Sequence, residues 1–506
     1  MDAPEVTELS EGAAPREREL TRASAATLIA AVTSIAVGLI RSKIVALVLG
    51  PFGVGAFATL NLYLSSVTVV AGAAAGRGAV RALAEMGDRD DPTRPWLQRY
   101  LFVGPLLIGV VLAAITAAAA GPLSGLLLGE PDLGFGLVLT AVAVPVAVIA
   151  ASHTHLLQAL LRVGTIARAD LVTTLVSLPL TAVLVIAFGL AGGIVAVGTG
   201  FAVRLLALRL LSPGVLPRGD WKRSLRIPSG VLRPILVMGS GAAILGIATT
   251  VGALLMRAQI VRTLGLDANG LYQPIVALSD TYLDVVIGAT SVYLFPRLTE
   301  LLTRGDRATA ERELGHGLRL SLAVSVPVIL VATGLSGLLI ELLYSAEFAD
   351  AAWPLTVQMA GTLLKVVSWS VGAALLPLGL TRAWVSIGLL VVVLRYVGVI
   401  VLTPSLGLVG AALAADTAWA IGAVATLVAV QRSRRLRVGW SDLIPVGVAG
   451  ILVVVVLAAR TIDEVLATLV TVAATILWLA MARRELGAVL HSLLDALPRH
   501  GRRSAG

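Results

Sequence analysis

Residues 133–152 read LGFGLVLTAVAVPVAVIAAS, an uncharged run that is long enough to cross a lipid bilayer as one helix. Comparable runs follow one another from Ala25 to Met481, separated by short polar segments. Only 14% of the 506 residues are charged and 57% are hydrophobic, whereas an ordinary soluble domain carries about 25% charged residues. The mean hydropathy is +0.93. The sequence therefore predicts an all-α polytopic membrane protein.

The apolar runs predict about fourteen transmembrane helices. An even number of crossings places both ends of the chain on the same side of the membrane. The expected spans are 24–49, 54–84, 100–121, 133–160, 168–188, 191–211, 234–263, 269–302, 317–343, 352–377, 383–403, 407–430, 443–460 and 464–482.

Basic side chains in the connections indicate the orientation. Residues 432–437 contain four arginines, whereas the connection at 50–53 contains no basic residue, and the other connections alternate in the same way. Because Lys and Arg accumulate in cytoplasmic loops, both termini are expected to be cytoplasmic. The net charge of +9 is interpreted as this orientation signal, so no nucleic-acid partner is expected.

The chain also repeats itself at two of the predicted external turns. Residues 49–57 (LGPFGVGAF) resemble residues 264–272 (LGLDANGLY) at an offset of 215, and residues 189–192 (GLAG) resemble residues 407–410 (GLVG) at an offset of 218. Two similar offsets predict two parallel six-helix bundles related by an axis along the membrane normal. Transporters of this kind bind their substrate between the bundles.

The connections are too short to hold a folded enzyme domain, so the protein is not expected to be an enzyme and no catalytic residue is assigned. Cysteine is absent and no zinc or nucleotide motif occurs, so neither a metal nor a cofactor is expected. The expected segments are a disordered cytoplasmic tail (1–22), an N-terminal six-helix bundle (23–212), a basic cytoplasmic linker (213–233), a C-terminal six-helix bundle (234–431), a basic loop with an additional helix pair (432–483) and a cytoplasmic tail (484–506).

Ionisable side chains deep in the predicted helices are functional candidates, because a charge in hydrocarbon costs from about 3 kcal/mol upward. Five deep cations outnumber three deep acids, and surplus positive charge predicts a cavity for an anion. The same groups would alternatively form internal ion pairs that lock the bundles together. The cations are Arg41, Lys43, Arg257, Lys365 and Arg395, and the acids are Asp280, Asp284 and Asp416.

Two further patterns refine these candidates. Asp280 and Asp284 are four residues apart, which places both on one helix face. Arg77 lies towards the cytoplasmic end of its helix, where a long side chain usually extends to the lipid headgroups; it is nevertheless kept among the candidates for substrate binding.

Polar residues recur at fixed spacing in the second bundle, at 255–257 (LMR), 270–273 (GLYQ), 278–283 (LSDTYL) and 291–298 (SVYLFPRL). Together with Lys43, residues 50–55 (GPFGVG), Asn61 and the small residues from 71 to 78, this pattern resembles the Wzx-type flippases for O antigen and enterobacterial common antigen. Those proteins belong to the multidrug/oligosaccharidyl-lipid/polysaccharide exporter superfamily.

The resemblance implies a flippase of the bacterial inner membrane that moves an undecaprenyl-pyrophosphate-linked oligosaccharide to the outer leaflet for cell-surface polysaccharide, such as lipopolysaccharide. It implies substrate binding by Asn61 and Gln273 beside the deep cations, and ion coupling by the deep acids. The implied partners are the lipid-linked oligosaccharide, membrane lipid, and the glycosyltransferases and polymerase of the same pathway.

Alternatives stay open at this stage. Wzx-type proteins typically have twelve spans and lipid II flippases fourteen, so the additional helix pair is also compatible with a peptidoglycan-precursor flippase. A cation-coupled multidrug exporter would need an acidic, aromatic cavity, whereas only 5% of the residues are aromatic. A membrane glycosyltransferase or polymerase would need a large loop or domain. An inert scaffold would tolerate neutral replacement of its deep charges.

Overall fold

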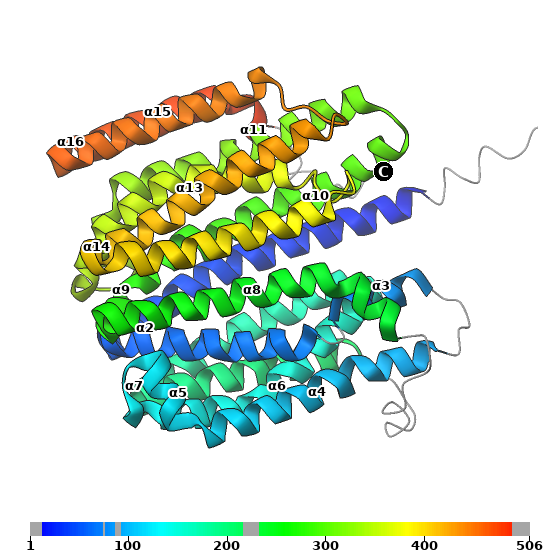
Figure 1. Cartoon of the computed structure of the whole chain (residues 1–506), viewed down its shortest axis with the longest axis vertical. Helices are drawn as coiled ribbons and strands as arrows, with labels where there is room; N and C mark the ends of the chain where they lie inside the picture. The colour runs from blue at the N-terminus through cyan, green and yellow to red at the C-terminus, as the bar shows by residue number, and fades with distance from the viewer. Residues whose placement is uncertain (1–12, 74–75, 87–92, 216–231, 488–506) are drawn as a thin grey trace, which may run out of the picture.

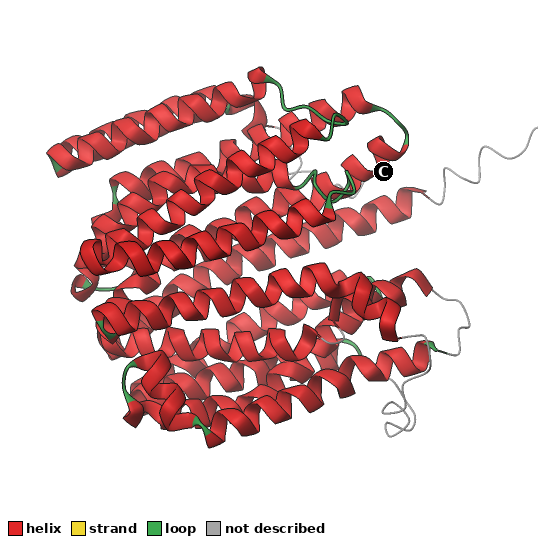
Figure 2. Ribbon diagram, viewed as in Figure 1, coloured by secondary structure: helices red, strands yellow, loops and turns green. Residues whose placement is uncertain are grey.

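The computed structural model describes residues 13–73, 76–86, 93–215 and 232–487. Within these ranges every regular element is a helix and no strand occurs, as Figure 2 shows. Nine of the helices in the described part of the chain are long and apolar enough to cross a membrane. The predicted fold class, an all-α polytopic membrane protein, is confirmed.

Most of the first half of the chain lies in the lower part of the molecule in Figure 1, whereas the N-terminal part of its first helix, in dark blue, runs across the middle. The first helix begins at Ala13, so residues 13–22, expected in a disordered tail, are helical; this segment is rich in Ala, Arg, Glu and Leu, which are strong helix formers. Residues 1–12 lie outside the described residues. The elements are α2 (Ala13–Ala73), α3 (Gly76–Met86), α4 (Arg94–Ala118), α5 (Ala120–Leu128), η1 (Pro131–Leu133), α6 (Gly134–Ala159) and α7 (Val163–Leu211).

The second half of the chain forms the other bundle. Most of the expected basic linker, residues 216–231, lies outside the described residues, as do residues 488–506 of the expected C-terminal tail. The elements are α8 (Leu232–Leu264), α9 (Leu266–Val276), the π-helical segment η3 (Ala277–Tyr282), α10 (Leu283–Thr303), α11 (Arg307–Gly334), α12 (Ser336–Leu343), η4 (Ala346–Ala351), α13 (Ala352–Gly372) and α14 (Thr381–Arg432).

The additional helix pair lies at the outer edge of the second bundle (Figure 1). It consists of α15 (Trp440–Ile462), which packs against α11 and α13, and α16 (Glu464–Met481), which packs against α11. Arg319 of α11 forms a 2.5 Å ion pair with Asp442 at the start of α15. The pair is therefore attached to the second bundle.

Left-handed glycines mark the turns of both halves. Gly50, Gly189 and Gly407 interrupt α2, α7 and α14 with φ values of 60°, 58° and 60°, and Gly265 separates α8 from α9 with φ 89°. Side chains other than glycine rarely adopt such values. The offsets from Gly50 to Gly265 and from Gly189 to Gly407 are those of the sequence repeat. Each interrupted helix holds two expected spans, which is consistent with fourteen crossings.

The two bundles meet where α2 crosses α9. A Cβ on Gly270 would lie 1.8 Å from the carbonyl oxygen of Pro51, and a Cβ on Gly55 would lie 2.4 Å from that of Leu266. Residues 51 and 55 correspond to 266 and 270 at the repeat offset of 215. Each repeat thus makes the same contact with the other, which is the reciprocity of a two-fold axis.

Apolar side chains surround this crossing and close the molecule at the end where the glycine turns lie, on the left of Figure 1. At the opposite end, α3 of the first bundle packs against α8 of the second. The bundles are therefore in contact at both ends. We call the apolar cluster the seal; it contains Ala56, Leu60, Ala120, Leu127, Leu128, Leu137 and Ile194 from the first bundle and Leu254, Val261 and Leu266 from the second.

Candidate functional site

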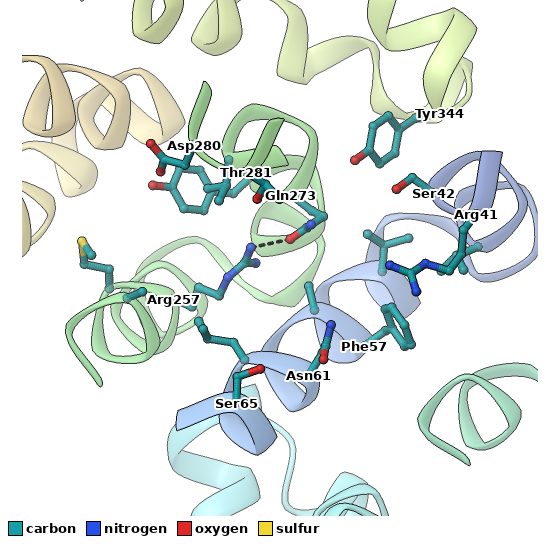
Figure 3. Close-up of a pocket in the computed structure, with 18 of the residues that line it drawn as sticks. Arg41, Ser42, Phe57, Asn61, Ser65, Arg257, Gln273, Asp280, Thr281 and Tyr344 are labelled. Atoms are coloured by element: carbon teal, nitrogen blue, oxygen red, sulfur yellow. Dashed lines mark hydrogen bonds between the residues drawn. The ribbon is translucent and has the colours of Figure 1, made fainter. Parts of the chain in front are cut away.

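A cavity of about 290 Å³ lies between the bundles. Its walls come from both halves of α2, from α8, α9, η3 and α14, and from Tyr344 after α12. Figure 3 shows Arg41 of α2 across the cavity from Arg257 of α8. The predicted site residues that line this cavity are Arg41, Asn61, Arg257, Gln273, Asp280 and Arg395.

Arg257 is the most enclosed cation of the cavity wall, with 5% of its surface exposed. Its Nη1 donates to Oδ1 of Asn269 at 3.0 Å and its Nη2 donates to Oε1 of Gln273, while its Cζ lies 5.7 Å from the centre of the Tyr272 ring. All these partners are neutral, and among the described residues no carboxylate lies within ion-pair distance of Arg257. Its charge is therefore stabilised but not cancelled.

A second group of charges is paired. Nζ of Lys365 lies 2.9 Å from Oδ1 of Asp280 and 2.5 Å from Oδ1 of Asp284, and Nη2 of Arg395 lies 2.7 Å from Oδ2 of Asp280. Both acids reach one ammonium group, so the prediction that they share a helix face is confirmed. Two cations and two acids make this cluster neutral as a whole. Internal ion pairing, which the sequence left open, therefore occurs, but it joins helices within the second bundle and does not lock the two bundles together.

Four predicted residues whose side chains are described do not line the cavity: Lys43, Lys365, Asp284 and Asp416. Lys43 instead donates to the carbonyl oxygen of Glu341 in α12 at 2.7 Å, which ties α2 to the second bundle. The side chain of Lys365 is 2% exposed and lies behind the wall, with its Nζ 5.9 Å and 5.7 Å from the rings of Trp369 and Trp419.

Asp416 of α14 packs against Gly361 of α13. A Cβ added to Gly361 would lie 2.0 Å from Cγ of Asp416. The side chain of Arg77 lies outside the described residues.

Sequence reasoning missed two polar residues beside the cavity. Asn269 is fully buried and joins Arg257 to α2, and the hydroxyl of Tyr272 accepts a 3.3 Å hydrogen bond from Arg395. Both lie in the repeated stretch 264–272, where Asn269 resembled an ordinary turn residue. The available signal was its polar side chain at the position where the first copy of the repeat has Val54.

A second, mostly apolar cavity of about 550 Å³ lies beside the first, between α8, α13 and α14. The two cavities share Ala253, Met256 and Arg395 as wall residues. Arg395 therefore stands at the boundary between a polar and an apolar space.

Comparison with known structures defines the class of protein. The lipid II flippase MurJ in an inward closed conformation superposes with a TM-score of 0.70 at 14% identity, covering 91% of this chain and 99% of MurJ. An inward-facing multidrug resistance MATE family transporter of the MOP superfamily superposes with a TM-score of 0.62 at 14% identity, covering 81% of this chain and 98% of the transporter. This chain therefore shares its fold with MurJ and with the MATE family transporter of the MOP superfamily.

The sequence identifies the family within this class. Residues 52–353, more than half of the chain, match the family described as "Polysaccharide biosynthesis protein", and the protein belongs to that family. The lipid III flippase of Escherichia coli (strain K12) is 26% identical over 369 residues, which is 70% of this chain and 84% of the relative. The resemblance noted in the sequence is confirmed, and these relatives are named as flippases and transporters, in agreement with the prediction of a non-enzyme.

Proposed function

We propose that this protein is a flippase that moves a polyprenyl-diphosphate-linked oligosaccharide from the cytoplasmic to the outer leaflet of a bacterial inner membrane. The observation that carries the proposal is Arg257, a buried cation whose partners are all neutral, in a cavity between the bundles. Among the described residues of the cavity wall, the charged groups are three guanidinium groups and the carboxylate of Asp280. This surplus of positive charge suits a diphosphate.

The wall residues divide by chemistry. Arg41, Arg257 and Arg395 are proposed to bind the diphosphate, because guanidinium groups donate paired hydrogen bonds to phosphate oxygens. The amides of Asn61 and Gln273 are proposed to bind sugar hydroxyls. The polyprenyl chain would remain in the surrounding lipid, as its length and apolarity require.

Translocation would follow the alternating-access scheme of two-bundle transporters. The end with α3 would face the cytoplasm, together with both termini, and the end with the seal would face outward. Separation at one end admits the lipid-linked head and separation at the other releases it. Asp280, Asp284 and Asp416 are proposed as carriers of a coupling ion, and the glycosyltransferases and polymerase of the pathway as partners.

A second candidate is a lipid II flippase. It is favoured by the helix pair α15 and α16 and by the coverage of 99% of MurJ. Lipid II also carries a diphosphate, so the cationic cavity fits both substrates and the difference lies in the sugars. A multidrug exporter for organic cations fits less well, because the cavity wall is mainly cationic.

The test is expression of the protein and its Arg257→Gln variant in two hosts, one lacking its lipid III flippase and one depleted of MurJ. The protein is expected to restore growth or surface polysaccharide in the first host, and Arg257→Gln is expected to lose this activity and accumulate lipid-linked oligosaccharide. The matched control is Arg262→Gln, which changes an exposed arginine of the same helix. Full activity of Arg257→Gln at normal protein level would contradict the proposal, and rescue of the second host alone would assign lipid II.

A further inference from the structure

Asn269 connects the cationic cavity to the contact between the bundles. Its Oδ1 accepts from Nη1 of Arg257 at 3.0 Å, and its Nδ2 donates to the carbonyl oxygen of Gly55 at 2.9 Å and to Oγ1 of Thr59 at 2.8 Å. A side-chain amide has two N–H donors and a carbonyl acceptor. All three are used, and they join α8 of one bundle to α2 of the other.

This amide lies at the close contact between the bundles, where α2 crosses α9. It follows Ala268 and precedes Gly270, whose Cα packs on the backbone of Pro51, and its partner Gly55 packs on Leu266. Asn269 and Thr59 are both fully buried. Opening the molecule at the seal would break the two hydrogen bonds to α2 and admit water to the amide.

Arg257 therefore has two roles: it lines the cavity, and it donates a hydrogen bond to Asn269 at the contact between the bundles. An anion in the cavity competes for the same guanidinium N–H groups, because charged acceptors form stronger hydrogen bonds than neutral amides. When Arg257 turns towards the anion, Oδ1 of Asn269 is left buried without a donor. An unsatisfied buried acceptor destabilises the closed state, whereas water satisfies it in the opened state.

We propose that Asn269 couples occupation of the cavity by a diphosphate to opening of the seal. The Asn269 amide holds the bundles together while Arg257 donates to it. When Arg257 instead binds the diphosphate, the amide no longer stabilises the closed state. This inference rests on the proposed function, since it takes the ligand to be a diphosphate. It adds a positioning residue that does not line the cavity.

The chain contains no cysteine, so one introduced thiol can report the opening. Ala56→Cys places it in the seal at a fully buried position. The protein is reconstituted in lipid nanodiscs, and the rate of thiol labelling by a maleimide is measured with and without farnesyl diphosphate. In this background, farnesyl diphosphate is expected to raise the labelling rate, whereas farnesol is not.

Asn269→Ala is expected to raise the labelling rate without ligand by roughly five- to tenfold, which corresponds to the loss of one or two buried hydrogen bonds. The same variant is expected to respond less to farnesyl diphosphate. Thr59→Val, which removes one hydroxyl partner, is expected to give a smaller increase and serves if Asn269→Ala does not fold. Gln259→Ala is the matched control, because it removes an amide of α8 that donates within its own helix, to Oγ1 of Thr263 at 3.1 Å, and its ligand-free rate is expected to be unchanged.

Ligand-free labelling that is unchanged in both folded variants would overturn the coupling role of Asn269. A Gln259→Ala rate as high as that of Asn269→Ala would overturn it as well, by showing a general loosening. Direct titration of farnesyl diphosphate separates the two proposals: absence of binding to the parent contradicts the diphosphate site and the coupling to it, whereas binding without any change in labelling contradicts the coupling alone.

Discussion

Arg395 and Asp280 form a 2.7 Å ion pair at the boundary between the polar and the apolar cavity. Asp280 also forms an ion pair with Lys365, so one carboxylate pairs with a cation from α13 and a cation from α14. The pair orients Arg395 at the cavity wall while Lys365 stays behind it. The neutral cluster and the uncancelled charge of Arg257 therefore have different consequences for stability and for binding.

Lys365→Met is expected to destabilise the protein by about 1–3 kcal/mol, because it leaves Asp284, whose side chain is 36% exposed, without its ion-pair partner and Asp280 with Arg395 alone. Adding Asp284→Asn to this variant should restore much of the loss, since it removes the unpaired carboxylate. Thermal unfolding in detergent measures both effects. A double variant no more stable than Lys365→Met alone would show that the ion pairs do not determine stability.

Gly270→Ala is expected to force the bundles apart, because its Cβ would collide with the carbonyl oxygen of Pro51. Overpacking of this kind destabilises by about 1–3 kcal/mol or more, and transport should be lost with it. Gly447→Ala in α15 is the control, since nothing lies within 4 Å of the added Cβ. Equal unfolding temperatures of the two variants would refute the tight crossing.

Asp442→Asn is expected to loosen the helix pair from the second bundle. Its carboxylate forms the ion pair with Arg319 and accepts a 3.1 Å hydrogen bond from the backbone N–H of Gly439. Trypsin should then cut faster after the arginines of residues 432–437, a loop held by the buried Leu436. Ser441→Ala, the exposed neighbour, should leave the cleavage rate unchanged; similar rates in both variants would argue against this attachment.

Arg41→Gln is expected to weaken binding of farnesyl diphosphate by about tenfold, the usual effect of losing one hydrogen bond to a charged group. Arg41→Glu should weaken it further, because the second change adds repulsion. Isothermal titration at low and high salt checks this order, and the differences should shrink as salt rises. Equal affinities of the parent and both variants would remove Arg41 from the site.

The sequence predicted the fold well because its signals are local. Twenty-residue apolar runs and positive-φ glycines in a repeated turn are readable without knowing which helices are neighbours. Depth along a helix was equally readable, and the cations selected by depth include Arg41, Arg257 and Arg395, which line one cavity.

The rotation of each helix about its axis was not readable, since it depends on distant packing. Lys43 therefore faces Glu341 and Lys365 faces two acids instead of the cavity. Asn269 was missed for the same reason, because its partners on α2 are more than 200 residues away in the chain.

The reciprocal packing of Gly55 and Gly270 also limits how the duplicated halves of the gene can diverge. A side chain at either position would collide with a carbonyl oxygen of the other half. Because that oxygen belongs to the main chain, no substitution of the opposite residue can remove it. Elsewhere the halves are free to drift apart, as Arg257 and Ser42 have done at equivalent positions. The contact between the two repeats therefore requires glycine at both positions, whichever side chains the rest of each repeat carries.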